Sequence, residues 1–249
     1  MFAKFQINIL CNAMDIVGNL VILAISWFLL RLEHKSLQNA LGLNLSIYRL
    51  LQFMVGFLAT VTLAVLVHYT YAVAANFTWV LRANISPYTL VLNVYAALSL
   101  VLLQELLFRG YLLYQGIGLL GERSANFISA AAFGMYHWFI LGVFGNPFLM
   151  VWVLLTTGIW GLMFAYAFSK THSLALPVGL HFGWAFVDKY ILSDSGQSLL
   201  VPVTSIHSRY PNTIESIMYL HLPKIAFAVL VIILLIKSRS LVSSRPKYK

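Results

Sequence analysis

Long apolar runs separated by short polar connections make up most of the chain. Seven of these runs are long enough to cross a bilayer as helices, which takes about 20 residues. They cover approximately residues 8–30, 50–75, 88–114, 125–144, 148–169, 174–192 and 214–236. We see no internal repeat and no second domain. The pattern therefore predicts an all-α, polytopic transmembrane helical bundle of about seven spans over residues 1–249.

Several runs begin with helix-start signals. Ser86 and Asn146 each precede a proline, which offers a capping side chain followed by proline in the first helical turn. Ser124 stands directly before the run 125–144 and is expected to cap that helix in the same way.

Composition agrees with a membrane protein. Hydrophobic residues make up 61% of the 249 positions and charged residues 9%, whereas about 25% charged residues is usual in soluble domains. The single cysteine, Cys11, excludes an internal disulfide and a cysteine-based metal cluster. The first residues lack a signal-peptide cleavage site, so we interpret the first run as a retained span.

The basic residues indicate a topology. Lys and Arg total 16 against 7 Asp and Glu, a net charge of +9. They lie in short loops and in the tail 237–249, without the patch or motif of a nucleic-acid-binding protein. We therefore expect membrane lipids as partners and no nucleic acid. Basic loops stay on the cytoplasmic side of membranes, and their distribution predicts an outer N-terminus and a cytoplasmic C-terminus.

Four ionisable residues stand out within the apolar runs, namely Glu105, Arg109, His137 and His181. Such groups are rare in spans and generally face the bundle interior with a partner. Glu105 and Arg109 are four positions apart, so they share a helix face and can pair. That pair could simply brace the helix. If the histidines converge on Glu105, the three could also activate a water or bind a metal ion.

The motifs around these residues resemble those of the CPBP intramembrane proteases, which include the CAAX prenyl endopeptidases and the bacterial Abi proteins. The segment QELLFRG (104–110) is similar to the family's Glu-Glu-x-x-x-Arg motif. FGMYH (133–137) matches Phe-x-x-x-His, and HFGWA (181–185) is similar to His-x-x-x-Asn. LGLNL (41–45) also resembles the family. The CPBP-like core would cover about 40–192.

This resemblance implies an intramembrane endopeptidase acting on a hydrophobic or lipidated peptide or a membrane-protein segment. In the family, the first glutamate and the motif-two histidine are understood to activate a water, while the motif-three histidine and asparagine stabilise the oxyanion. Carried over, His137 becomes the water-activating residue, His181 an oxyanion donor, and Arg109 the partner of Glu105. Residues expected to contact substrate are Phe108, Phe133, Trp184 and Ala185. No cofactor is expected; zinc, if bound, would sit on Glu105, His137 and His181.

Two positions depart from the family pattern. Gln104 occupies the place of the catalytic glutamate, and an amide cannot take up a proton at working pH. Ala185 replaces the asparagine and has no donor. Losing one oxyanion donor lowers the rate by roughly 10²–10³, and losing a general base typically lowers it by about 10²–10⁴.

Three explanations remain open. Glu105 could take over as base, although pairing with Arg109 would lower its pKa. Gln104 could be a Glu→Gln change introduced to inactivate the enzyme, but the second departure at Ala185 argues against a single deliberate change. The site could also be rearranged in a divergent member, with Asp188 either adding a polar group near His181 or lying exposed at the helix end.

The functional alternatives follow from these departures. The alternative to a protease is a catalytically disabled relative that binds a peptide or partner in an immunity or regulatory role. A transporter or channel is disfavoured, because the sequence lacks the Gly- or Pro-interrupted spans that many transporters carry at matching positions in two halves. In either favoured case we expect an integral protein of a prokaryotic plasma membrane.

Overall fold

The computed structural model describes residues 2–83, 85–194, 198–205, 208–209 and 211–238, with side chains described from residue 16 onward. The side chain of Cys11 and tail residues 239–249 lie outside the described residues. The helices are α1 (Phe2–Leu32), α2 (Leu37–Leu41), α3 (Ile47–Ala75), α4 (Pro87–Arg109), α5 (Tyr111–Leu120), α6 (Glu122–Ile140), α7 (Pro147–Thr171), α8 (Ala175–Phe186), α9 (Thr213–Ser216) and α10 (Leu222–Lys237). Two π-helical turns, η1 (Val187–Ile191) and η2 (Ile217–His221), continue α8 and precede α10.

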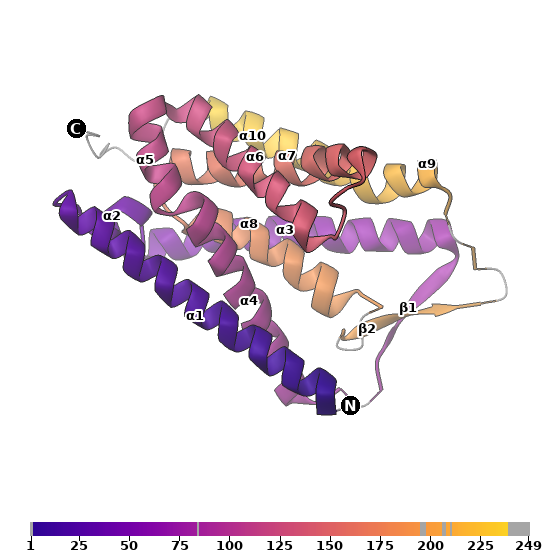
Figure 1. The fold of residues 1–249 in the computed structure, drawn as a ribbon. Helices are drawn as coiled ribbons and strands as arrows, with labels where there is room; N and C mark the ends of the chain where they lie inside the picture. The colour runs from indigo at the N-terminus through magenta and orange to yellow at the C-terminus, as the bar shows by residue number, and fades with distance from the viewer. Residues whose placement is uncertain (1, 84, 195–197, 206–207, 210, 239–249) are drawn as a thin grey trace.

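The helices form the predicted bundle, with a small addition. Strands β1 (Phe77–Leu81) and β2 (Leu200–Thr204) pair antiparallel, with Phe77 opposite Thr204 and Leu81 opposite Leu200. The apolar-run pattern did not predict this two-stranded sheet. It joins the loop after α3 to the loop after η1, beyond one end of the bundle (Figure 1).

Fewer helices meet the requirements of a membrane span than the predicted seven. Within the described residues, four helical stretches are long and apolar enough, namely Ile47–Ala75, Pro87–Leu120, Pro147–Thr171 and Thr213–Lys237. The described apolar part of α1, Ile16–Leu32, is shorter, and α8 has only 12 residues. A membrane-spanning helical bundle is therefore supported, whereas seven spans are not confirmed.

The proline-linked caps are confirmed. The Ser86 side chain accepts a hydrogen bond from the Thr89 amide, and Asn146 accepts one from Leu149. The cap predicted at Ser124 is wrong, because α6 already begins at Glu122. Gly121, with φ of 80°, makes the sharp turn from α5 that sets this earlier start.

The central helix α8 packs closely along α3, with α4 on one side and α7 on the other (Figure 1). Gly183 allows this approach, because a Cβ there would collide with the Phe57 carbonyl and the Thr60 hydroxyl of α3. The α6–α7 pair and α10 lie beyond α8, and α1 covers α4. This arrangement turns α4, α6, α7 and α8 toward one interior region.

Candidate active site

A carboxylate–imidazole hydrogen bond joins α4 to α8. Glu105 Oε1 lies 2.7 Å from Nδ1 of His181. The Glu105 side chain is fully buried and that of His181 is 13% exposed. Since Glu105 offers an acceptor, Nδ1 of His181 carries the proton and Nε2 keeps its lone pair.

Arg109 anchors the same carboxylate from one turn further along α4. Its Nη1 lies 3.3 Å from Glu105 Oε1, which is the pairing expected from the four-residue spacing. Its Nη2 donates to the Gly161 carbonyl of α7 over 2.9 Å. Gly161 has no side chain, and a Cβ there would lie 3.2 Å from that nitrogen. The fully buried guanidinium is thus held between two helices.

Aromatic rings surround the Arg109 guanidinium. Its central carbon lies 4.3 Å from the Phe133 ring centroid, 5.2 Å from Phe164 and 5.7 Å from Phe108. A buried cation over an aromatic face gains up to ~2 kcal/mol. Phe164 also stacks on the His181 ring with centroids 4.8 Å apart. The same rings therefore fix both partners of Glu105.

His137 approaches this region from α6. Its Nδ1 lies 2.8 Å from the Phe133 carbonyl oxygen, so Nδ1 carries a proton and Nε2 is a free acceptor. The Phe133 ring lies between the two histidines, 4.5 Å from the His137 centroid and 5.8 Å from that of His181. The structure thus brings the imidazoles of both motifs to one aromatic residue.

Gln104 precedes Glu105 in α4 and is also buried, but its side chain leaves the helix in a different direction. It shares a helix face with Phe108, four residues on, and Phe108 packs on Phe133 and Tyr136 of α6. Gln104 therefore belongs to the side of α4 that faces the His137 helix, whereas Glu105 faces His181. Gln104 Oε1 and Glu105 Oε2 are buried without a hydrogen-bond partner in the described part of the chain.

Comparison with protein families identifies this region. Residues 85–187 match the family model described as type II CAAX prenyl endopeptidase Rce1-like. Over these residues the chain is similar to type II CAAX prenyl endopeptidases of the Rce1-like kind. The match spans α4 to the start of η1 and includes all three motifs, so the resemblance to CAAX proteases is confirmed over this range. Comparisons with curated proteins and with solved structures give no match.

The side chains expected to contact substrate have packing partners in this Rce1-like region. Phe108 and Phe133 cover Arg109, as described above. Ala185 packs against the main hydrophobic core, and it offers no polar group. The Trp184 ring lies 5.1 Å from that of Trp160. Their roles toward a substrate stay predictions.

The Rce1-like motif residues do not fit a zinc site. Among the described residues, no three His, Cys, Asp or Glu side chains are placed to hold a metal ion. Glu105 Oε1 is shared by Arg109 and His181, and the buried guanidinium beside it would repel a second cation.

Sequence reasoning missed several contacts of the site. Gly161 and Phe164, which hold Arg109 and His181, belong to an apolar run that carries no motif. Asp188, expected to be either a site group or an exposed acid, is 47% exposed and lies 3.1 Å from Nε2 of His68. His68 and Asp188 lie on α3 and η1, far apart in the chain, so no local sequence pattern predicts that they pair.

Proposed function

We propose that the protein is an intramembrane endopeptidase that hydrolyses a peptide bond in a prenylated or otherwise hydrophobic, membrane-associated peptide. The observation that carries the proposal is the 2.7 Å hydrogen bond between buried Glu105 and His181. A carboxylate that holds an imidazole in one tautomer makes its other nitrogen a competent base. The Rce1-like match supplies the reaction class.

His181 acts as the general base in this proposal. Its Nε2 takes a proton from a water, whose oxygen attacks the peptide carbonyl carbon. Glu105 stabilises the imidazolium that forms. When the carbon–nitrogen bond breaks, Nε2 returns the proton to the leaving amine. His137 Nε2 accepts a hydrogen bond from the water's other hydrogen, which stays on the attacking oxygen, and so orients the attack. This assignment differs from the roles that the family resemblance implies, because the carboxylate now stands at 105.

Gln104 stabilises the oxyanion. Its amide nitrogen can donate hydrogen bonds, which is the function lost with alanine at 185. Gln104 is buried, and Phe108, one turn further along α4, packs on Tyr136, the neighbour of His137; this supports a donor on that side of α4. In this proposal the donor amide stands at position 104 in place of 185, and the carboxylate that serves the base stands at 105 in place of 104.

The test is cleavage in proteoliposomes of a peptide library with and without a prenylated cysteine, with products identified by mass spectrometry. The native chain is compared with His181→Ala, and His221→Ala, on the remote η2 turn, serves as the matched control. Products from the native chain and the control, but not from His181→Ala, support the proposal. Equal cleavage by all three would contradict it.

A catalytically disabled, peptide-binding relative is the second candidate. It is favoured by one observation, that neither Gln104 nor Ala185 can perform the family role of its position. In that case Gln104→Glu together with Ala185→Asn would create hydrolysis that the native chain lacks. Native cleavage of any peptide would exclude it.

The orientation in the membrane is also proposed. Basic residues gather at the end of the bundle where α1 and α10 end and α3 begins, including Arg31, Lys35, Arg49, Lys170 and Lys237. We assign this end to the cytoplasm by the positive-inside rule. A prokaryotic plasma membrane stays a prediction.

A further inference from the structure

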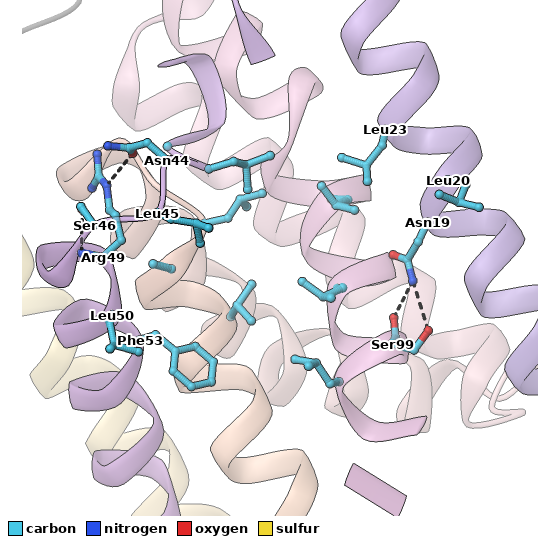
Figure 2. Close-up of a pocket in the computed structure, with 18 of the residues that line it drawn as sticks. Asn19, Leu20, Leu23, Asn44, Leu45, Ser46, Arg49, Leu50, Phe53 and Ser99 are labelled. Carbon is cyan, nitrogen blue, oxygen red and sulfur yellow. Dashed lines mark hydrogen bonds between the residues drawn. The ribbon is translucent and has the colours of Figure 1, made fainter. Parts of the chain in front are cut away.

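A second site lies apart from the motif residues. A cavity of about 810 Å³ opens between α1, α4, α8 and the connection from α2 to α3. Its volume falls within the ~300–1,000 Å³ typical of small-molecule sites. Figure 2 shows the two sides, with Asn19, Leu20 and Leu23 of α1 facing Asn44, Arg49 and Phe53 across the space.

The cavity is amphipathic. Most of its wall is aliphatic or aromatic, with Leu23, Leu102 and Val178 as examples from three helices. Asn44 and Arg49 line the wall at the start of α3, and on the opposite wall Asn19 donates to Ser99. The charged group lies only at the α3 end, so an occupant would need a long apolar part and an anionic end.

Arg49 is the one charged side chain among the described residues that line this cavity. Its hydrogen bonds go to neutral acceptors, the Gln52 side chain at 3.0 Å, the Thr171 carbonyl at 2.9 Å and the Asn44 side chain at 3.4 Å. No carboxylate of the described residues forms an ion pair with it. The positive charge is thus fixed in place, half-buried and available to an anion.

The cavity's polar end lies at the start of α3, a helix long and apolar enough to span a membrane. Arg49 is in the first turn of α3, and the preceding Leu45 and Ile47 are 104% and 72% exposed. The preceding helix α2 is anchored to the start of α8, because the Leu174 amide donates to the Leu41 carbonyl over 3.0 Å. Exposed apolar side chains beside a fixed arginine suit the boundary between headgroups and acyl chains.

We propose that this cavity binds an anionic phospholipid, with its phosphate on Arg49 and an acyl chain between α1, α4 and α8. A substrate peptide fits less well. Leu106 lines the cavity, but the adjacent Glu105 turns away toward His181. Neither Glu105 nor His181 lines the cavity, so a chain held there would not contact the proposed catalytic pair. The site is independent of the proposed protease activity.

The experiment is native mass spectrometry of the delipidated, full-length protein titrated with phosphatidylglycerol or phosphatidylcholine of identical chains. The variants are Arg49→Gln, Arg49→Lys and Leu20→Trp, which fills the cavity from a position that is 61% exposed. The matched controls are Arg31→Gln, at the same end of the bundle, and Val17→Trp, which is 60% exposed on α1 outside the cavity.

The native chain should bind phosphatidylglycerol more tightly than phosphatidylcholine. Arg49→Gln should weaken the binding of phosphatidylglycerol about tenfold, which corresponds to the loss of one charged hydrogen bond. Arg49→Lys should keep the preference for phosphatidylglycerol, Leu20→Trp should weaken the binding of both lipids, and the two controls should bind like the native chain. Equal losses for Arg31→Gln and Arg49→Gln, or no effect of Leu20→Trp, would overturn the proposal. So would a dimer in place of bound lipid. If Arg49→Gln does not fold, Arg49→Lys and Leu20→Trp decide the question.

Discussion

Glu105 and His181 are 76 positions apart in the chain, yet Oε1 of one and Nδ1 of the other are 2.7 Å apart in the bundle interior. The same oxygen lies 3.3 Å from Arg109 Nη1. One carboxylate therefore neutralises a buried cation and fixes the tautomer of a histidine. The stability of the bundle and the proposed chemistry of the site therefore both depend on the Glu105 side chain.

Removing the carboxylate should destabilise the fold. Glu105→Ala leaves the Arg109 guanidinium buried without a counter-charge, which costs about 3–5 kcal/mol. Glu122→Ala is the control, because its ion pair with Lys170 is partly exposed and such pairs contribute about 0–1 kcal/mol. Unfolding of both variants in detergent is measured beside the native chain. Similar midpoints for the two variants would refute the bracing role of Glu105.

Gly183→Ala should separate α3 from α8. The added methyl group collides with the Phe57 carbonyl, and overpacking of this kind costs about 1–3 kcal/mol or more. Gly158→Ala in α7 is the control, because its Cβ would be 3.7 Å from the nearest atom. That change should be neutral or stabilise by about 0.5–1 kcal/mol. The prediction fails if thermal unfolding shows the two alanines to be equally tolerated.

Acid should weaken the contact between the end of α1 and α5. The hydrogen bond from Lys35 holds the pKa of Glu33 below its ordinary value of 4.5, and Tyr111 donates to the same carboxylate over 2.8 Å. A group with a lowered pKa contributes stability above its unfolded pKa and loses it as the pH falls through the folded value. The unfolding temperatures of the native chain and Glu33→Gln should therefore converge below about pH 4.5. A gap that stays constant down to pH 3 would contradict this.

Gln104 should matter for turnover. If its amide donates to the oxyanion, Gln104→Ala lowers kcat by about 10²–10³ and leaves KM nearly unchanged. Gln104→Glu should also lower kcat, because a carboxylate cannot donate. Steady-state kinetics on one cleaved peptide checks both. An increase in kcat for Gln104→Glu would instead assign position 104 the family's role as base.

The sequence predicted those features that depend on local signals. Ser86 and Asn146 mark helix starts because the cap and the following proline are adjacent in the chain. The pairing of Glu105 with Arg109 follows from helical periodicity alone. Ser124 failed as a cap because Gly121 already turns the chain into the helix three residues earlier.

Features that depend on contacts between distant segments could not be predicted. The β1–β2 pairing joins residues more than a hundred positions apart, and neither strand alternates clearly enough to stand out from the apolar runs. The role exchange at His181 likewise depends on how α8 lies against α4. From the motifs, Arg109 was the expected partner of Glu105, and His181 was expected to face the oxyanion.

The most direct test compares peptide hydrolysis by the native chain, Glu105→Gln and Gln104→Glu in proteoliposomes, with each variant's fold verified by its unfolding temperature. If the Glu105–His181 pair is the catalytic base, the native chain cleaves and Glu105→Gln is about 10²–10⁴-fold slower. If the native chain is inert and only Gln104→Glu cleaves, the pair has a structural role and the protein's function is binding.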